Sequence, residues 1–420
     1  MSHSVLAALI FLVTYIIIIS ERIHRTPAAL LGGLLMILLK IIPQEEAFQS
    51  LDLNVIFLLA GMMMIAHLLG ETGVFQWLAI KAVLLGKGDP LRIMLLIATF
   101  TALSSALLDN VTVVVLMAPV TLFVARNLDI SPVPFLITEV MASNIGGAAT
   151  LIGDPPNILI ASAAGIPFTL FLANMGPPIL VILGIYLFIA VRQFRNQLNV
   201  SPERRQSVLR LETKGVIRNP VLLAQACAVL VLVLVGFLLQ GALELEPASI
   251  ALFGATLLLI WTRRDPVKVL ESVEWATLMF FIGLFITVEG LRHVGVIDQV
   301  AQALLQVTRG SQSVTTLFIL WFSAISSGVV DNIPYTATMI PLVQNLAHSM
   351  DVTPIWWALA LGADLGGNLT LVGASANLVV ASLAERSGYK LTFGQFLRYG
   401  TLTVFISLVI STLYLWIRYL

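Results

Sequence analysis

The chain has 420 residues, of which 58% are hydrophobic and 11% are charged, with 23 Lys and Arg against 23 Asp and Glu. Soluble domains carry about 25% charged residues, so this composition excludes a soluble enzyme and a disordered chain, and the zero net charge excludes a nucleic-acid partner. The single cysteine, Cys227, excludes a disulfide scaffold and a thiolate metal site. The composition predicts an all-α polytopic membrane protein.

Apolar runs that could enter or cross a bilayer follow one another along the chain, each near the roughly 20 residues that a span needs. They cover residues 5–20, 27–43, 53–70, 91–126, 133–164, 173–191, 220–240, 247–261, 275–291, 312–347, 354–384 and 399–417. No Lys or Arg precedes the first run, so we interpret it as a membrane helix and not as a cleavable signal.

Two runs, 91–126 and 312–347, are unusually long and are interrupted near the middle by Asp109-Asn110 and Asp331-Asn332. A carboxylate is costly in lipid, and non-helical backbone at membrane depth needs protein or water around it. We therefore predict that each run is a re-entrant helical hairpin with the Asp-Asn pair at its tip. Two full crossings in each run are the alternative, because each half is about as long as a short span.

With hairpins in these two places, the chain crosses the membrane about ten times. Of the 23 Lys and Arg residues, 19 then fall on one side, which the positive-inside rule identifies as the cytoplasm. We expect a multi-pass protein of a bacterial-type inner membrane, with both termini outside and the segment 192–219 as the main cytoplasmic loop.

The two halves of the sequence match at a nearly constant offset. Asp109-Asn110 matches Asp331-Asn332 at an offset of 222, and residues 144–153 match residues 364–373 at an offset of 220. The first hairpin lies on the cytoplasmic side and the second outside, so the repeats are inverted, as in many secondary transporters. The predicted organisation is an N-terminal helix (1–26), a first repeat (27–191) with a broken helix (133–164), a linker (192–219), and a second repeat (220–420) with a broken helix (354–384) and a terminal helix.

Small and polar residues at the hairpin tips and helix breaks form the candidate site, because transporters of this kind bind near the midplane at paired broken helices. Glycine allows close backbone approach, and amides and hydroxyls offer ligands. The candidate substrate-binding residues are Asn110, Thr112, Asn144, Gly146, Gly147, Thr150, Asn157, Asn332, Gly366, Gly367, Asn368, Thr370, Ser375 and Asn377. The candidate proton- or cation-coupling residues are Asp109, Asp154, Asp331 and Asp364.

Helix capping is the competing role for Asp154 and Asp364. The sequence has no GxxxxGK[ST] motif, no Ser/His/Asp constellation and no His/Cys metal spacing. We therefore expect no enzymatic activity, no catalytic residue, no resident metal and no cofactor.

The tip sequences DNVT (109–112) and DNIP (331–334), together with IGGAATLIGDPPN (145–157) and its echo LGGNLTLVGASAN (365–377), resemble the ion transporter superfamily. Within it, the chain resembles the branch of ArsB-type arsenite permeases, NhaD-type sodium/proton antiporters and the melanosomal P protein, over about residues 27–415. The resemblance implies a scaffold domain, a mobile transport domain that carries the hairpins, an elevator movement and often a homodimer. Dicarboxylate and citrate carriers are more distant relatives, and dicarboxylate carriers usually have Ser-Asn-Thr at the tips.

The four candidate carboxylates have no Lys or Arg within the broken segments to balance them. Two unit charges about 4 Å apart interact by about 4 kcal/mol at an effective dielectric constant near 20, so an anionic substrate is disfavoured. Sequence and resemblance favour efflux of arsenite or antimonite coupled to proton influx. Sodium/proton antiport is the alternative, followed by a dicarboxylate or other anion carrier, and a channel or membrane enzyme is the rival of another class. Besides the lipid bilayer, a homodimer and a cytosolic ATPase are the partners to consider.

Overall fold

The computed structural model describes residues 2–20, 22–198, 200–209 and 215–420, and within these ranges all regular structure is helical. The first half contains α1 (His3–Ser20), α2 (Arg25–Leu38), α3 (Gln44–Gln49), α4 (Leu53–Glu71), α5 (Val74–Leu85), α6 (Pro90–Ser105), α7 (Asn110–Leu128), α8 (Val133–Gly147), α9 (Pro155–Ala164), α10 (Phe168–Phe194), the 3-10 helix η1 (Arg195–Gln197) and α11 (Pro202–Val208).

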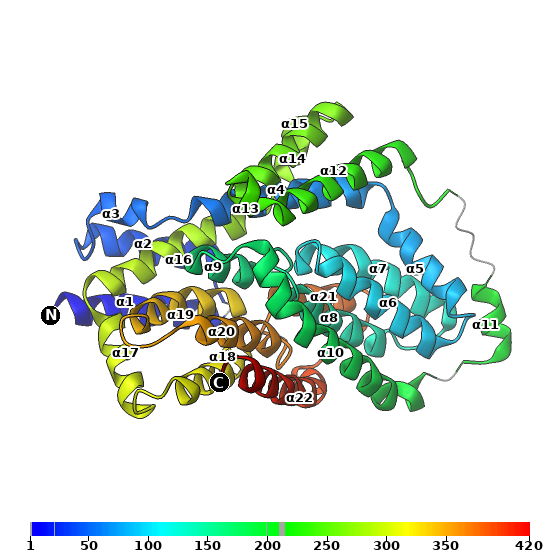
Figure 1. Cartoon of the computed structure of the whole chain (residues 1–420). Coiled ribbons are helices and arrows are strands. Elements are labelled where there is room, and N and C mark those ends of the chain that lie inside the picture. The colour runs from blue at the N-terminus through cyan, green and yellow to red at the C-terminus, as the bar shows by residue number, and fades with distance from the viewer. Residues whose placement is uncertain (1, 21, 199, 210–214) are drawn as a thin grey trace.

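The second half repeats this order, as Figure 1 shows by label. It contains α12 (Pro220–Leu238), α13 (Gln240–Leu243), α14 (Pro247–Thr262), α15 (Pro266–Glu271), α16 (Trp275–His293), α17 (Val296–Val307), α18 (Gln312–Ser327), α19 (Asn332–Leu346), α20 (Thr353–Gly366), α21 (Ser375–Arg386) and α22 (Phe393–Tyr419). From α2/α14 to α7/α19 the matched helices begin 222 residues apart, and α8/α20 and α9/α21 begin 220 residues apart.

Both interrupted runs form helical hairpins, with turns between Ser105 and Asn110 and between Ser327 and Asn332. In Figure 1 the α6–α7 hairpin and the α18–α19 hairpin occupy opposite halves of the molecule. The two broken helices, α8–α9 and α20–α21, also run in opposite directions across it. The all-α membrane fold with paired hairpins and broken helices is thereby confirmed.

Two glycines allow the first arm of each hairpin to lie directly against a broken helix. A Cβ atom on Gly146 of α8 would stand 2.1 Å from the Ala102 carbonyl oxygen of α6, and one on Gly366 of α20 would stand 2.4 Å from the Ala324 carbonyl oxygen of α18. Contact this close is available only to glycine. The hairpins and broken helices therefore pack as one unit through matched glycines.

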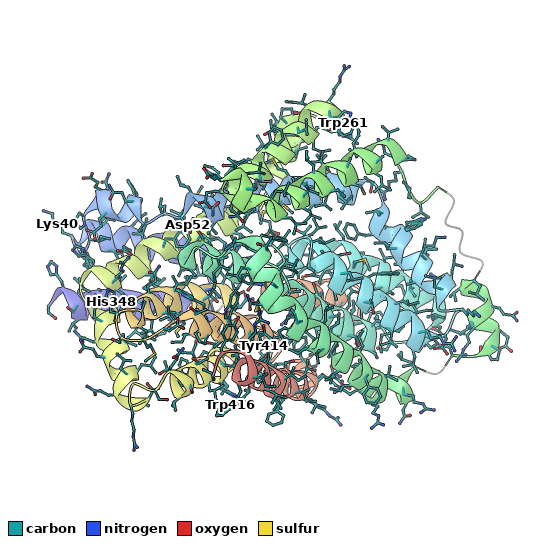
Figure 2. All side chains as sticks on the ribbon, in the orientation of Figure 1. Lys40, Asp52, Trp261, His348, Tyr414 and Trp416 are labelled. Atoms are coloured by element: carbon teal, nitrogen blue, oxygen red, sulfur yellow. The ribbon has the colours of Figure 1, made fainter. Side chains whose placement is uncertain are left out.

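The outer surface of the molecule is apolar, as expected for a protein surrounded by lipid. Among the described residues, seven helices are long and apolar enough to cross a bilayer: α1, α4, α7, α10, α12, α16 and α22. Large apolar side chains such as Leu38, Ile260 and Ile417 are 73%, 70% and 76% exposed. Figure 2 shows Trp261 and Trp416 on this outer surface. A soluble protein rarely exposes so much contiguous apolar surface.

Candidate functional site

The tips of the two hairpins meet at one carboxylate. Asn110, the first residue of α7, donates through Nδ2 to Asp154 Oδ2 at 2.8 Å, and Asn332, the first residue of α19, donates through Nδ2 to both Asp154 oxygens at 3.3 Å. Asp154 is 1% exposed. A buried carboxylate needs hydrogen-bond donors, and each bond to a charged group contributes about 1.5–3 kcal/mol. The two repeats thus supply one donor each to the same buried acid.

Asp154 stands at the N-cap position of α9, yet its side chain makes no capping hydrogen bond. Pro156, at the second helical position, has no N–H for a capping side chain, and the N–H of Asn157 at the third position donates to the Asp154 backbone carbonyl oxygen at 3.0 Å instead. The carboxylate is therefore directed to the hairpin tips and not along its own helix.

The aspartates at the tips do cap helices. Asp109 Oδ2 accepts from the Thr112 N–H at 2.9 Å and from the Thr112 hydroxyl at 3.0 Å. Asp331 Oδ1 accepts from the Ile333 N–H at 3.1 Å. Each carboxylate fixes the first turn of the second hairpin arm, and this presents the following asparagine to Asp154.

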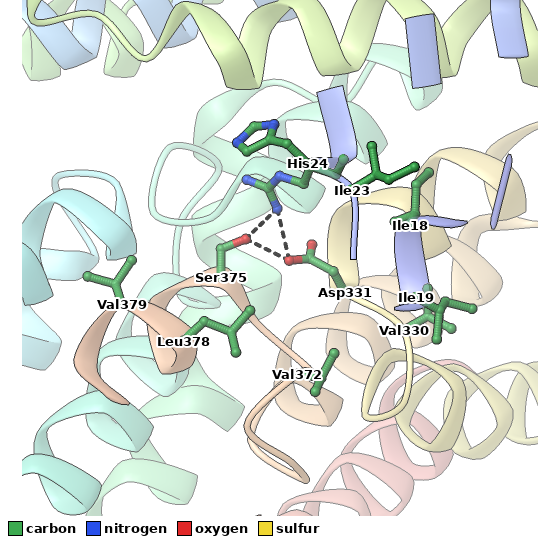
Figure 3. Close-up of a pocket in the computed structure, with 11 residues that line it drawn as sticks. Ile18, Ile19, Ile23, His24, Val330, Asp331, Val372, Ser375, Leu378 and Val379 are labelled. Atoms are coloured by element: carbon green, nitrogen blue, oxygen red, sulfur yellow. Dashed lines mark hydrogen bonds and ion pairs between the residues drawn. The ribbon is translucent and has the colours of Figure 1, made fainter. Parts of the chain in front are cut away.

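Asp331 has a further set of partners that sequence reasoning missed. Arg25, at the start of α2, places Nη1 3.1 Å from Asp331 Oδ2 and 2.6 Å from the Ser375 hydroxyl, which itself donates to Asp331 at 2.6 Å (Figure 3). The sequence places Arg25 beside the first apolar run and far from the second hairpin, so no local signal links them. The negative charge of Asp331, for which the sequence shows no nearby basic residue, is therefore balanced by Arg25 at the start of α2.

Matched threonines and asparagines hold the two breaks in shape. Thr150 and Thr370 donate to the carbonyl oxygens of Ala106 and Gly328, both at 2.6 Å, and so tie each break to the nearer hairpin turn. Asn157 donates to Gly147 and Thr150 carbonyl oxygens at 3.3 and 3.1 Å. Asn377 donates to Gly367 and Thr370 carbonyl oxygens at 2.8 Å. These donors satisfy carbonyl groups that the interrupted helices leave without partners.

Asn144 connects the breaks of the two repeats. Its Nδ2 group donates to Asn368 Oδ1 at 3.0 Å and to Asn377 Oδ1 at 2.9 Å, and its Oδ1 accepts from Asn110 at 3.4 Å. The matched residue of the second repeat is Asp364, which is fully buried within α20 and does not cap a helix. A network of amides therefore continues inward from Asp154.

A small cavity lies between the tips. It is lined by the predicted residues Asp109, Asn110, Asp154, Asn332 and Ser375, and also by Arg25, Met63, Val111, Pro155, Glu274, Thr277 and Ile333. The space open to the centre of a water molecule is about 20 Å³, which is room for about one or two waters. Among the described residues, no group of three or more His, Cys, Asp and Glu side chains could hold a metal ion.

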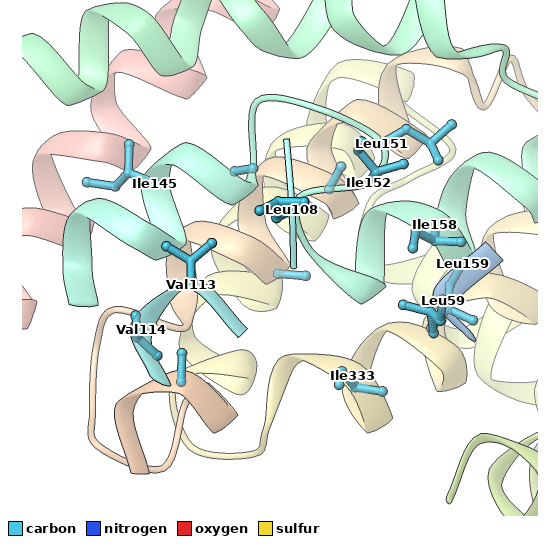
Figure 4. Close-up of a cluster of buried hydrophobic side chains, with 14 of the residues drawn as sticks. Leu59, Leu108, Val113, Val114, Ile145, Leu151, Ile152, Ile158, Leu159 and Ile333 are labelled. Carbon is cyan, nitrogen blue, oxygen red and sulfur yellow. The ribbon is translucent and has the colours of Figure 1, made fainter. Parts of the chain in front are cut away.

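Apolar side chains enclose the site. Leu108 and Val113 flank the first tip, Ile333 follows the second, and Ile152 and Ile158 flank the first break; all are buried (Figure 4). This packing shields Asp154 from bulk water and lowers the dielectric constant around it, so its charge interacts more strongly than it would at a surface.

The chain is similar to transporters over most of its length. The family model described as "Citrate transporter" matches residues 15–362. An uncharacterized transporter of Mycobacterium tuberculosis is 45% identical over 424 residues, which cover 99% of both chains. The 46 kDa membrane protein of Mycobacterium leprae is 44% identical over 425 residues, again 99% of both.

Two further similarities extend this set. The human P protein is 33% identical over 487 residues, which cover 96% of this chain and 58% of the P protein. The solved structure of the YdaH transporter of Alcanivorax borkumensis superposes with a TM-score of 0.60 at 14% identity, over 89% of this chain and 86% of the other. At that identity the likeness concerns the fold alone.

Proposed function

The chain belongs to the citrate transporter family, and from that premise we propose that it is a proton-coupled secondary transporter that exports arsenite or antimonite in exchange for protons. The observation that carries the proposal is the shared donation of Asn110 and Asn332 to Asp154. A carboxylate at the meeting point of two inverted repeats is placed to exchange a proton for a solute as the tips change their contacts.

The charge of the cavity supports a neutral or cationic solute. Asp109, Asp154 and Glu274 line it, and Arg25 is the basic residue that faces them. Citrate, which the family description names, carries several negative charges and would add to this excess. Arsenious acid is neutral and has three hydroxyl groups, which the amides of Asn110, Asn332 and Asn144 can bind without a change of charge.

Sodium/proton antiport is the second candidate, and the size of the cavity favours it. About 20 Å³ of open space suits a single small cation, whereas arsenious acid needs the tips to separate first. Carboxylate and amide oxygens are the hard ligands that such a cation prefers. Sodium and protons would then compete for Asp154.

We further propose that the hairpins and broken helices move as one transport domain against a scaffold that includes α2, α4, α14 and α16. The matched glycine contacts at Gly146 and Gly366 support this division, because they bind each hairpin tightly to a broken helix. In this scheme both termini lie outside and residues 192–219 lie in the cytoplasm.

Everted membrane vesicles from cells that express the protein test the function. Energised vesicles should accumulate arsenite, and Asp154→Asn should abolish the accumulation, whereas Glu385→Gln, a change of an exposed acid on α21, should leave it intact. If sodium discharges the pH gradient and arsenite does not move, antiport replaces arsenite efflux. If the vesicles take up citrate and respond to neither arsenite nor sodium, the acidic cavity does not exclude an anionic substrate and both proposals are wrong.

A further inference from the structure

Two pairs of residues occupy equivalent places in the inverted repeats, and their chemistry differs. In one pair, Asn144 Nδ2 donates to Asn377 Oδ1 at 2.9 Å. In the other, Asp364 stands in the place of Asn144 and Asn157 stands in the place of Asn377, each 220 residues away. The donor of the first pair is thus replaced by a carboxyl group in the second.

The orientation of the Asn157 amide is set by its other contacts. Its Nδ2 group donates to the Gly147 and Thr150 carbonyl oxygens, which is the same arrangement that Asn377 makes with Gly367 and Thr370. The Oδ1 atom is therefore the part of the amide left without a partner among the described residues, and Asn157 is the polar side chain that interacts with Asp364.

An ionised Asp364 would meet this amide oxygen without a donor. Within the described residues, neither Asp364 oxygen nor Asn157 Oδ1 has a hydrogen-bond partner that supplies a proton, and both residues are fully buried. A charge buried without a partner costs several kcal/mol, and a buried carboxyl group is neutral instead.

We infer that Asp364 is protonated in this conformation and that its hydroxyl group donates to Asn157 Oδ1. The acid O–H then takes the place of the Asn144 N–H of the other repeat. This inference deepens the proposed function and rests on it for one point, that protons are exchanged at this acidic site; Asp364 then holds the proton in the conformation in which Asp154 accepts from the two tip amides. Proton release leaves a carboxylate, so Asp364 must first separate from Asn157 and gain donors or water.

The surroundings of Asp364 favour the neutral acid. Asp154, at the neighbouring break, lies near enough to Asp364 for negative charges on the two acids to oppose each other. Glu139 of the adjacent α8 is bonded to Thr121 of α7. Helices α10 and α22 pack against α20, and their basic residues are exposed on the surface of the molecule: Arg192, Arg398 and Arg418. Within the described part of the chain, Asp154 has two amide donors and no hydrogen bond to Asp364 is found, so the two acids are suited to different protonation states.

Infrared spectroscopy of the purified protein in lipid tests the inference without any substrate. The difference spectrum of wild type minus Asp364→Asn at neutral pH should contain one carboxylic-acid carbonyl band that shifts in heavy water. The same difference for Glu385→Gln, an exposed acid, should contain none. Absence of the band from the Asp364→Asn difference would overturn the inference.

Asp364→Asn is expected to fold, because the new amide can donate to Asn157 as Asn144 donates to Asn377. Its thermal unfolding temperature should equal or exceed that of wild type, and a pH gradient should no longer drive its transport. A large loss of stability would contradict the pairing. If the infrared band is present but vesicles do not transport arsenite, Asp364 is protonated and only the proposed substrate is wrong. The failure of the inference and the failure of the proposed function are therefore distinguishable.

Discussion

The guanidinium group of Arg25 lies 3.1 Å from the Asp331 carboxylate, and this ion pair joins the start of α2 to the tip of the second hairpin. Asp331 also caps α19 and accepts from Ser375 at the start of α21. One carboxylate thus joins α2, near the start of the chain, to α19 and α21 of the second repeat. If the hairpins move against α2, this contact has to break in each cycle.

Arg25→Gln should lower the stability of the resting conformation. The two side chains are 26% and 11% exposed, so solvent screens the pair in part and we expect a coupling of about 1 kcal/mol. A double-mutant cycle with Asp331→Asn, measured by thermal unfolding in detergent, isolates this value. Arg22→Gln, three residues earlier and exposed, is the control. Strictly additive effects of the two changes would contradict an energetic link.

Asn110→Ala should impair transport more than stability. It removes the donor 2.8 Å from Asp154, and the loss of a hydrogen bond to a buried charge costs about 1.5–3 kcal/mol. We expect proton-driven flux to fall about 10-fold or more, since 1.4 kcal/mol corresponds to about a factor of 10. Asn127→Ala changes an exposed asparagine on the same helix and serves as the control. Equal flux in the two variants would exclude a role for this amide.

Gly146→Ala and Gly366→Ala should each disrupt the packing of a hairpin on its broken helix. The added methyl groups would stand 2.1 and 2.4 Å from backbone oxygens that cannot move aside, and overpacking of this kind costs about 3 kcal/mol. We expect a lower unfolding temperature and poor recovery of folded protein. Gly184→Ala on α10, where a Cβ atom meets nothing within 4 Å, should instead be neutral or stabilising by up to about 1 kcal/mol.

Asp351, in the exposed turn before α20, should give the protein a small dependence of stability on pH. The Thr353 N–H and hydroxyl donate to its Oδ1 atom at 2.9 and 2.7 Å, and these bonds hold the pKa of the carboxyl group below its usual range. Because the pKa is lower in the folded state, the stabilisation is present at neutral pH and is lost as the pH falls below about 4.

Asp351→Ala should therefore unfold at a lower temperature than wild type at pH 7, and the difference should shrink as the pH falls through the acidic range. Thermal scans at several pH values measure this. A difference that stays constant with pH would show that the carboxylate charge plays no part.

The hairpins and breaks could be predicted because their signals are local and occur twice. Asp109-Asn110 and Asp331-Asn332 interrupt apolar runs, and a polar pair within such a run excludes a plain lipid-facing helix. The second copy at a fixed offset makes chance agreement implausible, and the observed turns lie at both pairs. The breaks around 148–154 and 367–374 follow in the same way from Gly, Pro and Asn.

The partners within the site could not be predicted, because they depend on contacts between distant segments. Arg25 and Asp331 are separated by 306 positions, and the sequence only indicated that Arg25 follows the first apolar run. Likewise, the sequence predicts Thr112 and Thr150 as ligands because of their hydroxyl groups, whereas in the structure these groups donate to the capping Asp109 carboxylate and to a carbonyl oxygen of the first hairpin turn. Periodicity and composition cannot distinguish these uses of a hydroxyl group.

The difference between the amide at position 144 and the acid at position 364 also bears on how the kinetics of transport compare at the two faces of the membrane. A protein built from two identical inverted halves would present the same pathway to either face of the membrane, and its kinetics would be the same for import and export. A single divergent side chain at equivalent depths removes that equivalence. Import and export can thus differ in rate while the backbone architecture of the two halves stays alike, and the gradients of ion and solute set which of them prevails.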